Sequence, residues 1–89
     1  MNALLRSIGL SPKLQRYGVF VSTHHLLSTQ PERTQLILSQ LFPEQNSDIM
    51  DSLRAGQMVM VREGSQEGLK TFAARLYSQG FQVTLKPLD

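Results

Sequence analysis

MVMVREGSQEGLKTFAARLYSQGFQVTLK, residues 58–86, holds the clearest folding pattern in the chain. Its middle part repeats apolar side chains at the spacing i, i+3, i+4, i+7 and i+8, which places them on one face of an α-helix. These side chains are Leu69, Phe72, Ala73, Leu76 and Tyr77. Ser65 stands before the pattern and Gly80 after it. Serine is a preferred helix N-cap, and glycine readily adopts the left-handed conformation that ends a helix. The spacing therefore predicts a helix between Ser65 and Gly80.

Both flanks of this helix are typical of β-strands. Residues 81–86 alternate apolar and polar side chains, which predicts a half-buried strand that ends before Pro87. Residues 57–62 contain an unbroken apolar run from Met58 to Val61. Such a run predicts a strand that is covered on both faces, either inside a sheet or beneath a partner on one face.

The first half of the chain predicts a strand followed by a helix. Residues 17–22 are rich in aromatic and β-branched side chains, as strands are. Thr29 and Glu32 match the capping box T-x-x-E, so we expect a helix from this cap to about Phe42, with Pro43 ending it. Its expected buried side chains are Leu36, Ile37, Leu41 and Phe42.

A second helix is expected directly after the first. Residues 46–48 are Asn, Ser and Asp, which favour a helix start, and Gly56 is suited to the helix end. The apolar face of this helix is predicted to consist of Ile49, Met50 and Leu53.

The order of these elements predicts an α+β fold. We expect residues 1–16 to form a basic N-terminal arm with a short helix at residues 2–8, and residues 17–89 to form a single domain in the order β-α-α-β-α-β. We expect two layers, with a three-stranded sheet covered by helices on one face. The unit at residues 57–86 could be a right-handed split crossover with the first strand between two parallel strands. The sequence leaves the strand order open.

The composition excludes several classes of function. The 89 residues are 40% apolar and 18% charged, which is typical of a globular domain. There is no cysteine, which excludes disulfides and thiolate chemistry and is compatible with the cytoplasmic location that we expect. No apolar run approaches the ~20 residues of a membrane-spanning helix, so we expect no membrane span.

His24 and His25 are the two histidines of the chain. Neighbouring side chains on an extended chain point to opposite sides, so the two rings are expected not to converge on one ion. No cysteine or third histidine is present to complete a zinc site. No nucleophile elbow or glycine-rich phosphate loop accompanies them. We therefore expect no metal, no cofactor and no enzymatic activity.

Residues 58–86 resemble the strand, EGxS turn, long helix, glycine and final strand of the C-terminal domain of the bacterial ribosomal stalk protein. Residues 37–42, followed by Asp48-Ile-Met50, are similar to the paired central helices of the Clp-protease adaptors that deliver N-degron substrates. The resemblance covers about residues 17–86. It implies a bacterial type of α+β domain that docks proteins without catalysis.

The functional motifs of these families are not matched. The adaptors hold an α-amino group with an Asn-Asp pair and a histidine, and these positions fall near His25, Leu26 and Arg54, where there is no acid. The stalk domain uses a helical face rich in glycine and lysine, whereas the matching residues 47–54 carry two acids and one arginine.

We therefore predict a small protein-binding module, such as an adaptor, an inhibitor or an accessory subunit of a larger complex. Its partner is another protein, which is expected to contact the connection between the first strand and the first helix. The predicted contact residues are His24, His25, Leu26, Leu27, Arg33 and Arg54. One of the two leucines is alternatively a core residue packed on the first helical turn. A homodimer formed through an edge strand or the N-terminal helix is a further possibility.

An alternative function follows from the charge distribution. The net charge is +2, and residues 1–31 contain basic side chains but no acid. Such an arm could contact the phosphates of a nucleic acid. The residues that would form this site are Arg6, Lys13, Arg16 and Tyr17.

Overall fold

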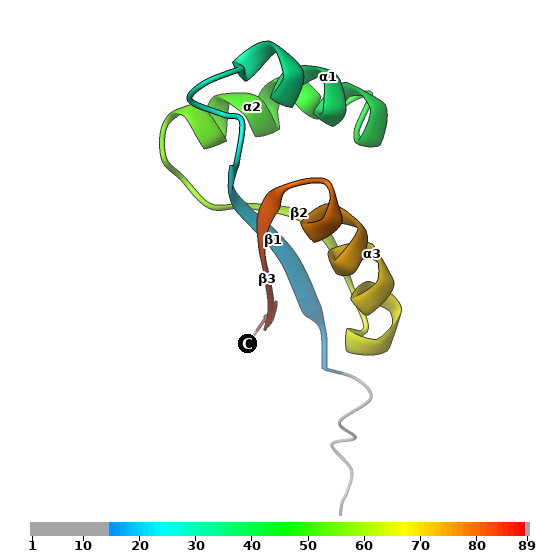
Figure 1. Ribbon diagram of the computed structural model, residues 1–89. Coiled ribbons are helices and arrows are strands. Elements are labelled where there is room, and N and C mark those ends of the chain that lie inside the picture. Colours follow the sequence, from blue (N-terminus) through cyan, green and yellow to red (C-terminus); the bar gives the residue numbers. More distant parts are fainter. Residues whose placement is uncertain (1–14, 89) are drawn as a thin grey trace, which may run out of the picture.

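A computed structural model describes residues 15–88 of the chain. Its elements are β1 (Tyr17–His24), α1 (Pro31–Leu41), α2 (Asn46–Arg54), β2 (Val59–Gly64), α3 (Gln66–Ser78) and β3 (Phe81–Pro87) (Figure 1). This order confirms the predicted α+β fold. The short helix predicted at residues 2–8 lies outside the described residues.

The three strands form one sheet in the order β2-β1-β3, and β1 is antiparallel to both neighbours. β2 and β3 are therefore parallel to each other and are joined by α3. This is the split crossover that the sequence left as one possibility. Figure 1 shows α3 lying along the sheet, while α1 and α2 lie together near the end where β1 finishes.

β2 is an edge strand of this sheet, so the prediction of an interior strand is wrong. Val59 and Val61 pack against the core, whereas Met58 and Met60 are 48% and 41% exposed. A register shift in the β1–β2 pairing leaves Val61 without a direct partner in β1. The apolar run of β2 therefore combines a core-facing side with exposed methionines, and it does not mark a central strand.

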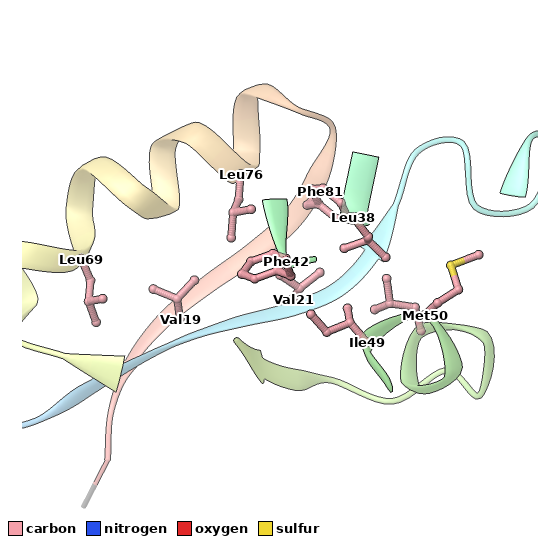
Figure 2. Packing of buried hydrophobic residues seen from close by; sticks show 10 residues of the cluster. Val19, Val21, Leu38, Phe42, Ile49, Met50, Leu69, Leu76 and Phe81 are labelled. Carbon is pink, nitrogen blue, oxygen red and sulfur yellow. The ribbon is translucent and has the colours of Figure 1, made fainter. Parts of the chain in front are cut away.

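One hydrophobic core follows the covered face of the sheet and continues between α1 and α2 (Figure 2). Val19 and Val21 of β1 are fully buried, and Leu76 of α3 points toward them. The apolar face predicted for α2 is confirmed by the burial of its members, Ile49, Met50 and Leu53. Burial of apolar surface is the main stabilising contribution to such a fold.

Three predicted helix ends are confirmed. The Ser65 hydroxyl accepts a hydrogen bond from the Gly68 amide at 3.0 Å and caps the start of α3. Gly80 follows α3 with a φ of 98°, and Gly56 follows α2 with a φ of 75°. Both glycines have the left-handed conformation that other residues adopt only with strain.

Two side chains expected in the core are exposed instead. Leu36 is 58% exposed and Tyr77 is 74% exposed. Thr34 and Leu38 occupy the core side of α1, and Leu36 lies about 200° around the helix from Leu38, at about 100° per residue. Tyr77 lies about 100° from the fully buried Leu76, so it falls at the border of the apolar stripe.

The start of α1 also differs from the prediction. The helix begins at Pro31, and its N-cap is Gln30, whose side chain makes no capping bond. The Gln30 amide donates to the Leu26 carbonyl at 2.7 Å, so the preceding turn extends to Gln30. The helix thus starts one residue later than a Thr29 cap requires, and the capping box with Glu32 is not formed.

Candidate protein-docking site

The β1–α1 loop, defined here as residues 25–30, is held by hydrogen bonds of its own backbone. The His25 amide donates to the Gly80 carbonyl at 3.0 Å, which fixes the loop to the turn between α3 and β3. The Leu27 amide donates to the His24 carbonyl at 3.0 Å, and the Gln30 amide donates to the Leu26 carbonyl at 2.7 Å. The loop is therefore a set of connected turns attached to two separate parts of the fold.

His24 lies beneath this loop and is only 3% exposed. Its Nε2 lies 2.8 Å from the Gln79 carbonyl, and its Nδ1 lies 2.8 Å from the Thr34 hydroxyl and 3.2 Å from the Leu26 amide nitrogen. A carbonyl can only accept, so Nε2 carries the hydrogen. Nδ1 is then the acceptor for the Thr34 hydroxyl and the Leu26 amide. Every polar atom of the neutral ring has a partner.

The electrostatic surroundings favour this neutral form. Burial lowers the pKa of His24 below its ordinary value of 6.5, and the nearby His25 lowers it further, whereas the Gln79 carbonyl acts in the opposite direction. Burial is the largest of these effects because a charged ring is poorly solvated inside a protein. His24 is therefore neutral near pH 7, as its hydrogen bonds require.

The two histidine rings lie close together, contrary to the prediction that they point apart. Their centroids are 4.7 Å apart at a tilt of 49°. Both rings lie against Gly80, where a Cβ atom would collide with the His25 ring and approach His24 Nε2 to 3.0 Å. Among residues 15–88, no group of three or more potential metal ligands is present, so the pair has no further ligand there.

The structure separates the predicted contact residues into buried and accessible ones. The prediction that His24 contacts a partner is wrong, because its ring is buried and its role is to support the loop. Leu27 packs against the core, which confirms the alternative interpretation of one leucine. His25 is exposed and Leu26 is half-buried, so both remain available at the surface of the loop.

Arg33 and Arg54 are exposed and lie at the same end of the α1–α2 pair. Arg33 belongs to the first turn of α1 and Arg54 is the last residue of α2. Figure 1 shows these two helices running in opposite directions, so the first turn of α1 lies near the last turn of α2. Within the described part of the chain, neither arginine takes part in an ion pair.

The residues that hold the loop from below were not predicted by any sequence pattern. Thr34 and Gln79 hydrogen-bond to the His24 ring, and Gly80 lies against both histidine rings. Gly80 was identified only as a helix end, and a threonine inside a helix gives no sign that its hydroxyl reaches another element.

The predicted nucleic-acid site gains no support from the described residues. Arg6 and Lys13 lie outside them. Arg16 forms an ion pair with Glu63 at 2.5 Å, so its charge is already partly neutralised. Tyr17 is half-buried and packs against the core.

An open hollow of about 290 Å³ lies between the α1–α2 turn and β2. Its lining residues are Leu41, Phe42, Pro43, Glu44, Gln45 and Arg62. The Arg62 guanidinium at the rim of this hollow lies 4.0 Å from the centre of the Phe72 ring, so it already takes part in a cation–π contact. The lining contains no histidine or hydroxyl side chain that would pair a base with a nucleophile.

Comparison with known proteins does not place the chain in a family. No protein-family model, curated protein or solved structure matches it. The resemblance to the stalk and adaptor domains therefore stays a prediction. Across residues 15–88, every helix is too short or too polar to cross a membrane.

Proposed function

We propose that this protein is a small non-enzymatic docking module, acting as an adaptor, inhibitor or accessory subunit of a larger complex. Its docking face consists of His25 and Leu26 of the β1–α1 loop together with Arg33 and Arg54. The observation that supports this proposal best is the way the loop is fixed. Buried His24 and the Gly80 carbonyl hold its backbone, while His25 and Leu26 remain accessible. A loop that is ordered before binding loses little conformational entropy when a partner binds.

The chemistry of this face favours an acidic partner segment with an apolar side chain. Arg33 and Arg54 are exposed cations without an ion pair among residues 15–88, and arginine binds carboxylates through two parallel hydrogen bonds. Leu26, a half-buried residue of the β1–α1 loop, supplies the apolar contact. Arginine is one of the residue types that are enriched at energetically important interface positions.

The proposal is tested by selecting binders from a displayed peptide library with the full-length protein. We expect the selected peptides to be acidic and to contain an apolar residue. Titration of such a peptide into ¹⁵N-labelled protein should shift the amide signals of the β1–α1 loop and of the helix ends that carry Arg33 and Arg54. Shifts confined to another surface, such as β2, would show that the docking face is wrong.

Charge reversal provides the quantitative test. Arg33→Glu and Arg54→Glu should each weaken peptide binding by about tenfold or more, which corresponds to ~1.4 kcal/mol. Lys70→Glu is the matched control, because Lys70 is an exposed cation in the first half of α3. If all three variants bind alike, the arginines do not form the face. A mobility-shift assay at low salt tests the nucleic-acid alternative, since such binding falls steeply with added salt.

A further inference from the structure

One imidazole connects four parts of the molecule. His24 is the last residue of β1, and its ring contacts the Leu26 amide in the loop, the Thr34 hydroxyl in α1 and the Gln79 carbonyl after α3. The neutral ring satisfies these partners with one donor and one acceptor. The acceptor, Nδ1, serves two donors at once. This shared acceptor is the point at which a proton would change the structure.

Protonation at Nδ1 affects its two partners differently. A hydroxyl can rotate, so Thr34 can accept a hydrogen bond from the new N–H group. A backbone amide is only a donor, so Leu26 would face a second donor 3.2 Å away and lose its bond. The bond that is lost is the side-chain contact that fixes the β1–α1 loop from below.

Among residues 15–88, no neighbouring charge would compensate the protonated ring. His25 on the loop is the titratable group that faces it, with ring centroids 4.7 Å apart, and a positive charge there repels a second one. Thr34 of α1 and Phe81 of β3, whose ring centroid lies 4.4 Å away, are uncharged. Within residues 15–88, no carboxylate forms an ion pair with His24.

We infer that protonation of His24 releases the Leu26 amide and loosens the β1–α1 loop, so that docking at this loop weakens in acidic solution. The direction agrees with the lowered pKa of His24, which shows that the folded protein resists this proton. The weakening of docking rests on the proposed function. The loosening of the loop does not, and it can be measured without a partner.

The loosening is tested by NMR on the full-length protein between pH 7.5 and pH 5. We expect the His24 ring nitrogens to report an Nε2–H tautomer at pH 7.5 and a charged ring once the pH falls below the lowered pKa of His24 in the folded protein. Over the same transition, the hydrogen-exchange protection factor of the Leu26 amide should fall at least tenfold, whereas that of Val21 should fall less, because it follows only the stability of the whole domain. Unchanged protection at Leu26 would overturn the inference, and so would an equal loss at Val21, which reports unfolding of the whole domain.

A second variant and a binding measurement complete the test. His25→Gln removes the facing charge, so the His24 transition and the loss at Leu26 should remain but move together to higher pH. The affinity of a selected acidic peptide should fall by about tenfold over this transition. If Leu26 loosens while affinity stays constant, the pH effect on docking is refuted and the β1–α1 loop is not the docking face. If Leu26 stays protected while affinity falls, the role of His24 is refuted and the docking face stands.

Discussion

At the scale of single residues, the most consequential position is a buried polar one. Burying His24 and Thr34 would destabilise the fold if their polar atoms lacked partners. Each finds one, because the Thr34 hydroxyl lies 2.8 Å from His24 Nδ1 and the Gln79 carbonyl lies 2.8 Å from Nε2. Polar core groups of this kind fix one arrangement of the elements, since any shift between them breaks a hydrogen bond.

Gly80 carries a prediction at the same scale. Gly80→Ala should destabilise the protein by about 2–3 kcal/mol, because it adds left-handed strain and a collision with the histidine rings. Gly56→Ala is the matched control, with a positive φ but nothing within 4 Å of its Cβ position. It should cost only about 1 kcal/mol. Urea unfolding of the two variants measures the difference, and equal values would show that the rings move aside without cost.

Residue types alone predicted the conformations of Gly56 and Gly80 and the cap at Ser65. These features depend on local backbone geometry, which the sequence encodes directly. The burial of His24 was not predictable in this way. Its partner Gln79 lies 55 positions away in the sequence, and only the assembled sheet brings the two together.

At the scale of elements, the buried face of α1 includes a polar residue, which makes this face difficult to recognise from the apolar pattern. Thr34, Ile37, Leu38 and Leu41 follow the spacing i, i+3, i+4 and i+7. This face is the one that packs toward the core. A pattern that counts only apolar side chains omits Thr34, and the prediction that Leu36 is buried is therefore wrong. Periodicity predicted the helix but not its rotation.

The rotation of α1 is tested by paired truncations. Leu38→Ala should destabilise the protein by about 2–5 kcal/mol, because it removes a fully buried side chain and leaves a cavity. Leu36→Ala should change the stability by less than ~0.5 kcal/mol, because the side chain is 58% exposed. Thermal or urea unfolding distinguishes the two, and similar losses would contradict the orientation of α1 described above.

The two predicted helix caps provide a second paired test. Ser65→Ala should cost about 1 kcal/mol, because its hydroxyl accepts the Gly68 amide at the start of α3. Thr29→Ala should cost almost nothing, because α1 begins at Pro31 and its N-cap is Gln30. A cost of about 1 kcal/mol for Thr29→Ala would instead support the capping box expected from the sequence. Urea midpoints of both variants provide the measurement.

At the scale of the whole molecule, the sheet order β2-β1-β3 determines where the candidate site forms. β1 lies between two strands, so its final residue meets the turn that leads from α3 into β3. His24 pairs with Phe81 across this end of the sheet, and the loop that follows is fixed there. The sequence predicts a docking role for this loop. The support beneath it arises only from the pairing of distant strands, which explains why the residues that position the loop were not predictable from the sequence.

The burial of His24 predicts how the stability of the whole domain depends on pH. In the unfolded chain His24 titrates with its ordinary pKa of 6.5, whereas burial lowers its pKa in the folded protein. Below about pH 6.5 the unfolded state therefore binds more protons than the folded state, so the free energy of unfolding falls as the pH is lowered. The free energy of unfolding should be constant between pH 8 and pH 7.5. At lower pH, a single histidine can lower it by at most about 1.4 kcal/mol per pH unit.

Urea unfolding at several pH values between 8 and 5.5 measures this decline. His24→Gln should have lower stability at pH 8 and a flatter profile below pH 6.5. His25→Gln should keep the decline, because the buried acceptor is still present. If His24→Gln does not fold, the NMR titration of His24 in the native protein gives an independent check, since the decline requires its folded pKa to lie below 6.5. A profile that is flat from pH 8 to pH 5.5 in the native protein would show that His24 accepts its proton without cost, and the structural role assigned to its Nδ1 would then be wrong.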